Sequence, residues 1–230
     1  MPGHPRRQDQ IFRKCGPAGS APGYRPLSCA YRRVSYDPAS QIVVTPGAMG
    51  ALFLALKVLL NPGDEVIVNE PCWTNYIQQI RMCGGVPVSV KTDAQRGFDL
   101  DVSAVAETIT SKTKAIILNS PCNPTGAVAS AETLSQLAKL AQERDLVVLA
   151  DEVYKHILFD GRTYTGFATL PGMKERTLVI DSLSKTYAMT GWRIGYVAGP
   201  RSVISAMASF QSQATSNPNS IAQYAAMKAL

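Results

Sequence analysis

Histidine is scarce in this sequence, and its cysteines show no metal-binding pattern. The 230 residues include two histidines, His4 and His156, and neither stands in a motif typical of catalysis. The five cysteines are odd in number and lack the short paired spacings of metal sites. Reduced thiols in the cytoplasm are the simplest interpretation, since disulfides are rare in that compartment. The sequence therefore predicts a cytoplasmic protein with no metal site.

Long apolar runs are missing as well. The most apolar window, residues 51–60, is interrupted by Lys57 and ends at Asn61, so it is too short to cross a bilayer. A secretory signal requires an apolar stretch after its first basic residues, and no such stretch follows the first arginines. The arginine-rich start leaves open the alternative of an organellar transit segment. We therefore expect no membrane association.

Acidic residues are few at the start of the chain. Residues 1–40 contain seven Lys or Arg, two Asp or Glu and ten Gly or Pro, and they show no sustained period. This composition predicts an irregular or disordered basic segment over residues 1–38. Residues 41–230 carry sixteen basic and fifteen acidic residues, so most of the formal charge of +6 belongs to the first forty. The remainder gives no reason to expect a nucleic-acid partner.

From Gln41 onward, short β-branched runs alternate with segments of helical periodicity. Such alternation predicts an α/β fold, a three-layer sandwich with helices on both faces of a mostly parallel seven-stranded sheet. The expected strands are residues 42–45, 65–68, 86–90, 115–118, 146–150, 177–180 and 194–198. In open α/β sheets ligands bind beyond the carboxyl ends of the strands, where the residues discussed below fall.

The expected helices have ordinary apolar faces. The first places Leu52, Leu56, Leu59 and Leu60 on one side, and a later one does the same with Leu134, Leu137, Ala138 and Ala141. Thr45-Pro46 has the pattern of an N-cap followed by proline at the first helical position. Residues 61–64, Asn-Pro-Gly-Asp, indicate a helix stop and a turn.

The stretch Asp181-Ser-Leu-Ser-Lys185 places a lysine in a turn of small residues directly after an expected strand. Taken alone, a lysine is usually an exposed surface residue. Here Ser182 precedes it, and Arg193 follows eight residues later. A lysine in such a place is a candidate for forming an imine, and desolvation with neighbouring positive charge would favour its neutral, nucleophilic form.

A carboxylate, a phenol and an amide accompany the lysine. Asp151 ends an apolar strand, where a buried carboxylate needs a cationic partner, although the alternative that it only caps the next turn stays open. Tyr154 lies three residues on, and Asn123 stands before Pro124-Thr-Gly126, which by itself is a turn signal. Together with the amine and Arg193, these groups form the set that a pyridoxal phosphate ring requires.

Two further segments are candidates for holding such a cofactor. Gly47, Ala48 and Met49 open a helix directly after a strand, so their free amides can face a phosphate, with Arg193 suited to bidentate contact. A glycine turn is weak evidence alone, and Arg193 could instead form a surface ion pair. The segment around Trp73 is the second, although this residue taken alone fits an ordinary half-buried core tryptophan better.

These motifs, in this order, resemble the fold-type I pyridoxal-phosphate aminotransferases of the aspartate/aromatic class, from about Tyr36 to Leu230. The resemblance implies that Lys185 carries the cofactor as an imine and moves a proton as general base and acid. It implies that Asp151 pairs with the ring nitrogen and that Asn123 and Tyr154 hold the phenolic oxygen. It also implies that Trp73 stacks on the ring and that Ser182, Arg193 and the amides after Gly47 bind the phosphate.

The same resemblance implies a reaction and partners. The reaction is transfer of an amino group from an L-amino acid to a 2-oxo acid by a homodimer, with residues 216–218 reaching the partner's site. A β-lyase of the same fold remains an alternative because substrate positioning decides the outcome. A catalytically silent cofactor-binding module is the other alternative. The sequence does not reveal the preferred substrate.

Two parts of the family pattern have no counterpart in the sequence. The small domain, with the arginine that grips the substrate carboxylate, is expected beyond Leu230, and residues 1–35 lack the usual site-lining segment. We therefore expect residues 39–230 to be the large cofactor-binding domain, incomplete at its C-terminus. A fragment, a mis-started gene product and a degraded copy would each fit this pattern.

Overall fold

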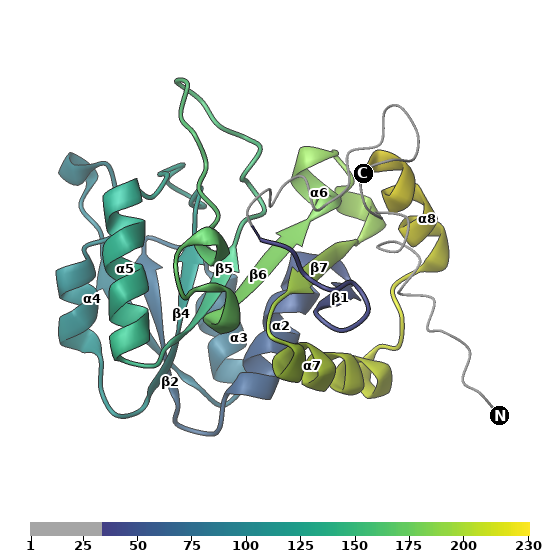
Figure 1. Ribbon diagram of the computed structural model, residues 1–230, viewed down its shortest axis with the longest axis horizontal. Helices are drawn as coiled ribbons and strands as arrows, with labels where there is room; N and C mark the ends of the chain where they lie inside the picture. Colours follow the sequence, from purple (N-terminus) through teal and green to yellow (C-terminus); the bar gives the residue numbers. More distant parts are fainter. Residues whose placement is uncertain (1–33) are drawn as a thin grey trace.

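The computed structural model describes residues 34–230 (Figure 1). The irregular segment expected over residues 1–38 therefore lies outside the described residues except for its last five, which form no helix or strand. His4 and the first two cysteines lie outside them too.

A single sheet of seven strands forms the centre of the molecule, in the order β1-β7-β6-β5-β4-β2-β3. All pairs from β3 to β6 are parallel, whereas β7 runs antiparallel to both β6 and β1. The mostly parallel seven-stranded sheet is thus confirmed. The strands are β1 Ile42–Thr45, β2 Glu65–Glu70, β3 Val86–Lys91, β4 Thr113–Asn119, β5 Val147–Asp151, β6 Thr177–Ser182 and β7 Gly195–Ala198.

Helices cover both faces of this sheet (Figure 1). On one face lie α2 (Gly47–Leu59), α3 (Asn75–Met82) and α7 (Arg201–Ala214), and on the other α4 (Val102–Thr108) and α5 (Ala131–Glu143). Neighbouring residues of β5 show the division, because Leu149 packs into the first core and Val148 into the second. This arrangement confirms the three-layer α/β prediction.

The remaining elements lie at the edges of the layers. A one-turn helix, α6 (Leu183–Thr186), follows β6, and α8 (Ser220–Ala229) packs against the segment around it in a small third core. Residues 34–230 also contain four short 3-10 turns: η2 Ala94–Arg96, η3 Phe167–Thr169, η4 Lys174–Arg176 and η5 Thr190–Trp192. No helix within residues 34–230 is both long and apolar enough to span a bilayer.

The start of α2 differs from the sequence prediction. Thr45 is the last residue of β1 and not an N-cap; its hydroxyl donates to the carbonyl of Gly47 at 2.9 Å. Pro46 takes the cap position, and the helix begins at Gly47 without a side-chain cap. Thr45 pairs with Gly195 in the sheet, and this pairing holds its backbone extended. The leucine faces were predicted correctly, since Leu52, Leu56 and Leu137 are fully buried.

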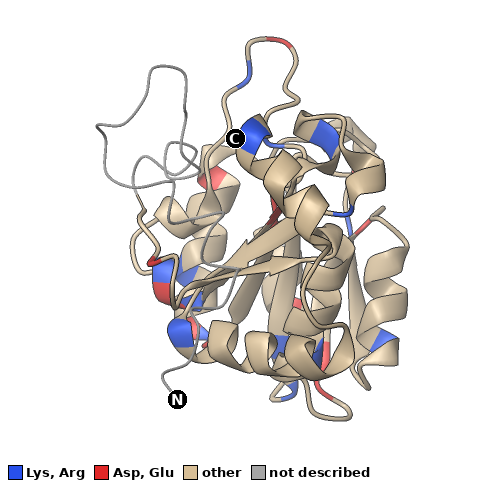
Figure 2. Cartoon of the chain, turned by 90° about the vertical axis from the view of Figure 1, so that its right-hand side faces the viewer, with Lys and Arg blue, Asp and Glu red and all other residues tan. Residues whose placement is uncertain are grey.

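The carboxyl ends of the central parallel strands meet at one edge of the sheet. Asn119 of β4 is paired with Asp151 of β5, and the next strand ends nearby at Ser182. Charged residues elsewhere are scattered and mixed in sign (Figure 2). The edge where β4, β5 and β6 end is therefore the place where polar candidates from three loops come together.

Candidate active site

A cavity of about 190 Å³ lies at this edge of the sheet. Nine of the ten residues proposed from the sequence line it, and the tenth, Gly47, lies directly behind Arg193. The lining residues are Ala48, Met49, Trp73, Tyr76, Asn123, Asp151, Val153, Tyr154, Ser182, Ser184, Lys185, Thr190 and Arg193. The fold therefore brings together motifs that are up to about 150 residues apart in the chain.

Asp151 provides a buried carboxylate in the cavity wall. It is 5% exposed, and its Oδ2 accepts a hydrogen bond of 2.6 Å from the Tyr76 hydroxyl while Oδ1 accepts one of 3.2 Å from the Val153 amide. The pKa of Asp151 is raised to about 6, and burial is the largest cause. The two hydrogen bonds act in the opposite direction, and the nearby Asp181 carboxylate adds a smaller upward effect. The Val153 contact is the turn-capping alternative, so Asp151 caps the turn and also faces the cavity.

Tyr76 was missed by the sequence analysis. It is 1% exposed, and burial together with the charge of Asp151 holds the pKa of its phenol well above the ordinary range. Its ring also meets the ring of Trp73 edge to face, with centroids 5.4 Å apart. Trp73 lies before Asn75, the first residue of α3, so helical spacing does not link the two aromatic residues and no sequence pattern singles out Tyr76.

The end of β4 fixes the backbone that carries Asn123. The side chain of Asn119 donates to the Asp151 carbonyl at 3.1 Å and accepts from the Asn123 amide at 2.7 Å. One buried amide thus joins two strand ends and the Asn-Pro-Thr-Gly turn. The side chain of Asn123 is left facing the cavity.

Lys185 stands in the one-turn helix α6 at the mouth of the cavity. Its Nζ lies 5.8 Å from the centre of the Tyr154 ring, a cation–π distance. Lys185 is exposed among the described residues 34–230, whereas the sequence led us to expect that its amine is shielded from water. The reason is its position, since α6 projects beyond the carboxyl end of β6, where the sheet no longer covers it.

Ser182 shapes the turn between β6 and α6. Its hydroxyl accepts from the Ser184 amide at 3.0 Å as the N-cap of α6 and donates to the Ile194 carbonyl at 2.9 Å. It also lies 2.8 Å from the Ser184 hydroxyl. These contacts place two hydroxyls beside Lys185 on a fixed turn.

Arg193 and the start of α2 form the opposite end of the cavity. Arg193 has a left-handed backbone, with φ of 53°, and donates from Nη1 to the Thr190 carbonyl at 2.9 Å. A β carbon on Gly47 would lie 2.6 Å from Arg193 Nη2, so only glycine lets the guanidinium lie against this helix start. The first-turn amides of α2 have no intrahelical acceptor and lie next to that positive charge.

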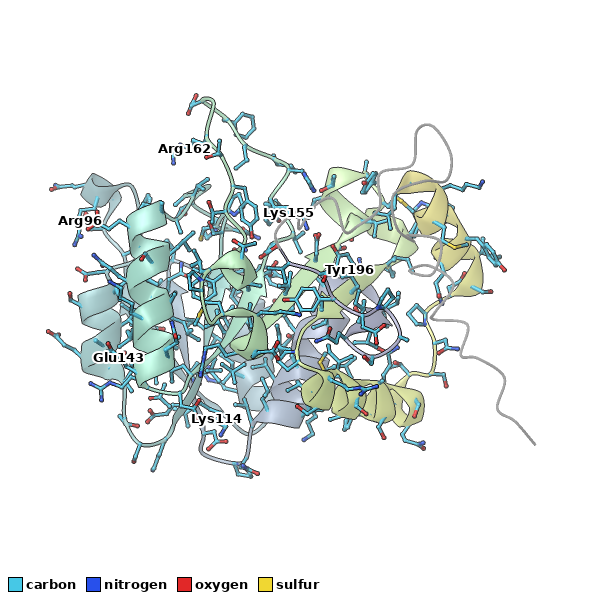
Figure 3. The ribbon with its side chains drawn as sticks, viewed as in Figure 1. Arg96, Lys114, Glu143, Lys155, Arg162 and Tyr196 are labelled. Carbon is cyan, nitrogen blue, oxygen red and sulfur yellow. The ribbon has the colours of Figure 1, made fainter. Side chains whose placement is uncertain are left out.

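A second buried charged cluster lies beside the cavity. Lys155 forms an ion pair of 2.5 Å with Asp181, and Tyr196 donates to the same carboxylate at 2.8 Å. Lys155 and Tyr196 lie in the middle of the molecule close to β6 (Figure 3). The other Asp181 oxygen accepts from the Ser182 amide at 2.6 Å. This cluster therefore fixes the backbone next to the residues that face the cavity.

Comparisons with known proteins agree with this geometry. A family model described as aminotransferase class I and II matches residues 5–230. The aspartate/prephenate aminotransferase of Thermus thermophilus is 44% identical over 217 residues, which cover 93% of this chain and 55% of that protein. The aspartate aminotransferase of Geobacillus stearothermophilus is 43% identical over 197 residues, covering 85% of this chain and 50% of its own length.

Solved structures give the same result. An aromatic aminotransferase from Pyrococcus horikoshii superposes with a TM-score of 0.83 at 41% identity, covering 85% of this chain and 52% of its own. An aspartate aminotransferase from Thermus thermophilus with maleate gives 0.80 at 45% identity, covering 83% and 49%. The chain thus spans about half the length of the relatives it matches.

Proposed function

Since the chain belongs to the class I and II aminotransferase family, whose members use pyridoxal phosphate, we propose that its cavity binds this cofactor and that the protein transfers amino groups. The donor would be an L-amino acid and the acceptor a 2-oxo acid. One observation carries the proposal: a primary amine, a buried carboxylate and a guanidinium, from Lys185, Asp151 and Arg193, line one cavity at the ends of neighbouring strands.

The donor set fits the cofactor. A buried carboxylate whose pKa is raised to about 6 is stabilised by a cation, which a protonated pyridine nitrogen supplies. The close approach of Gly47 to Arg193 leaves backbone amides and a guanidinium together, a combination suited to phosphate. An amide and a phenol, from Asn123 and Tyr154, line the same cavity and can donate to a ring oxygen.

Each residue then has a definite task. Pyridoxal phosphate supplies, when bound, an electron-withdrawing ring that stabilises negative charge on the substrate's α carbon. Asp151 would hold the ring nitrogen protonated, Trp73 would cover one face of the ring, and Asn123 with Tyr154 would hold its oxygen. Ser182, Arg193 and the amides of Ala48 and Met49 would bind the phosphate.

Lys185 has the central task in this proposal. Its amine would attach the cofactor covalently and would be released when the substrate takes its place. The released amine would then take the proton from the α carbon of the substrate as a general base and deliver it to C4′ of the cofactor as a general acid. Lys185 is exposed and lines the cavity, which supports this role, because an incoming substrate can reach its amine without any movement of the buried residues of the cavity, such as Asp151.

Further parts of the proposal concern the whole protein. We propose residues 39–230 as the cofactor-binding domain and a homodimer as the assembly. Exposed Trp192, Ile221 and Tyr224 support the dimer, since apolar side chains on a surface favour association. The free thiols of Cys72, Cys83 and Cys122 support a cytoplasmic location. Sedimentation velocity across a range of concentrations would test the assembly.

An assay of three products tests the function. The purified protein is loaded with pyridoxal phosphate and supplied with 2-oxoglutarate and aspartate, phenylalanine or alanine; aspartate is tried first because relatives are named for it. Glutamate formation that is lost in Lys185→Ala is the expected result. S-methylcysteine is added as a fourth donor because it carries a leaving group on its β carbon. Methanethiol, pyruvate and ammonia formed from it without glutamate would instead identify a β-lyase. Bound cofactor with no product from any donor would identify a binding module, and either outcome would overturn the proposal.

A further inference from the structure

Tyr76 of α3 contacts two groups that face the cavity. Its hydroxyl donates to Asp151 at 2.6 Å, and its ring lies at 89° to that of Trp73 with 5.4 Å between centroids. The Tyr76 side chain is 1% exposed, so protein atoms rather than water surround it. A residue one turn further along α3, Gln79, donates to the Met49 carbonyl at 3.1 Å and ties α3 to the first turn of α2.

The hydrogen bond from Tyr76 decides how Asp151 is presented. A carboxylate buried to this degree is costly when ionised, and a short hydrogen bond from a phenol stabilises its charged form. The bond also fixes the rotation of the carboxyl group, because Oδ2 is held by Tyr76 and Oδ1 by the Val153 amide. The lone pairs of the Asp151 carboxylate that accept neither of these hydrogen bonds therefore keep one orientation, and the carboxyl group need not rotate before it accepts a further hydrogen bond.

The electrostatic surroundings of this pair come from several elements. The groups that act on Asp151 or on Tyr76 are the Asp181 carboxylate of β6, which is paired with Lys155, and the Cys72 and Cys122 thiols. Lys185, Arg193 and Tyr154 line the same cavity. Asp181 opposes ionisation of Asp151, and Tyr76 favours it.

We propose that Tyr76 is the positioning residue for the cofactor ring: its hydroxyl holds the Asp151 carboxylate that meets the ring nitrogen, and its ring holds the Trp73 indole that covers the ring. One side chain would thus set both contacts to the ring at once. This inference rests on the proposed function, since the ring is the ligand that Asp151 and Trp73 would meet.

The chain contains a matched pair for comparison. Tyr196 donates to Asp181 at 2.8 Å, so a buried tyrosine and aspartate form the same bond on neighbouring strands. Tyr196 and Asp181 do not line the cavity, whereas Tyr76 and Asp151 do. Tyr196→Phe is therefore the control for Tyr76→Phe, because both remove one buried phenolic hydroxyl that donates to a carboxylate.

The first experiment uses the cofactor-free protein and the carbon NMR signal of the Asp151 carboxyl group, assigned with Asp151→Asn. In Tyr76→Phe the pKa of Asp151 should rise by about one to two pH units, because a hydrogen bond to the charged form is lost. In Tyr196→Phe it should stay near the wild-type value. No rise in a folded Tyr76→Phe would overturn the inference, whatever the protein does with pyridoxal phosphate.

The second experiment measures the affinity for pyridoxal phosphate by equilibrium dialysis between pH 6 and 9. Tyr76→Phe should lose up to about tenfold near pH 6.5 and much less near pH 8.5, where its Asp151 is ionised again. A loss of equal size at every pH would reveal a purely structural role and would contradict the inference. If the wild type bound no cofactor, the proposed function would be wrong. The NMR titration of the cofactor-free protein would still test whether the Tyr76 hydroxyl lowers the pKa of Asp151.

A third measurement covers the case in which Tyr76→Phe does not fold. In the wild type with labelled tyrosine, the phenolic carbon signal of one tyrosine should titrate with a midpoint near 6, the value of Asp151. That titration should vanish in Asp151→Asn and persist in Tyr196→Phe. A wild type in which no tyrosine signal follows Asp151 would overturn the inference.

Discussion

Gly195 of β7 lies against the peptide that joins Gly47 to Ala48. A β carbon on Gly195 would come within 2.5 Å of the Gly47 carbonyl carbon and 2.6 Å of the Ala48 nitrogen. Both neighbours are backbone atoms, which cannot rotate away as a side chain can. The start of α2 therefore reaches the turn that carries Arg193 only because this position has no side chain.

Gly195→Ala should damage the proposed phosphate site. The added methyl group must push the start of α2 away from β7, so we expect a loss of about 1–3 kcal/mol in the free energy of unfolding and weaker binding of pyridoxal phosphate. Gly191→Ala is the control, since a β carbon there meets nothing within 4 Å. Urea unfolding and cofactor titration of both variants would check this, and similar behaviour of the two would contradict it.

Much of the fold could be predicted from the sequence. Runs of β-branched residues such as those of β5 are long enough to indicate buried strands, and leucines at helical spacing indicated α2 and α5. The start of α2 was predicted one residue too early. The pairing of Thr45 with Gly195, a contact across 150 residues, decides that boundary, and no local pattern contains it.

The site could be predicted only in part. Lys185, Asp151 and Arg193 stand in recognisable motifs, so their presence in one cavity follows from the strand order. Tyr76 has no motif of its own, because its importance comes from a hydrogen bond between α3 and the end of β5. The exposure of Lys185 also depends on how far α6 projects beyond the sheet, which a sequence pattern does not specify.

Arg193→Ala should weaken binding of the phosphate and leave binding of the ring largely intact. A charge-assisted hydrogen bond contributes roughly 1.5–3 kcal/mol, so we expect about a ten- to a hundredfold loss of affinity for pyridoxal phosphate. Pyridoxal, which has no phosphate, is the control ligand. An equal loss for both ligands would show that Arg193 supports the fold and does not bind the phosphate.

Asp151→Asn should change how stability depends on pH. The pKa of Asp151 is about 6 in the folded protein, above its ordinary value of 3.8, so the stability it contributes is present at low pH and lost as pH rises through 6. Relative to Asp151→Asn, the cofactor-free wild type should lose about 2–3 kcal/mol between pH 4 and pH 7.

Urea unfolding of the cofactor-free protein across this pH range would measure the effect. Asp160→Asn, at an exposed position, serves as the control and should follow the wild type closely. A constant difference between Asp151→Asn and the wild type over the whole range would show that burial does not raise the pKa of Asp151.

Covalent attachment of pyridoxal phosphate to Lys185 tests the central claim most directly. The protein is mixed with the cofactor, reduced with borohydride, digested and mapped by mass spectrometry, alongside Lys185→Ala and the exposed control Lys139→Ala. We predict one modified lysine, Lys185, in the wild type and in Lys139→Ala, and no stoichiometric modification in Lys185→Ala. Modification of another lysine, or undiminished labelling of Lys185→Ala, would contradict the account.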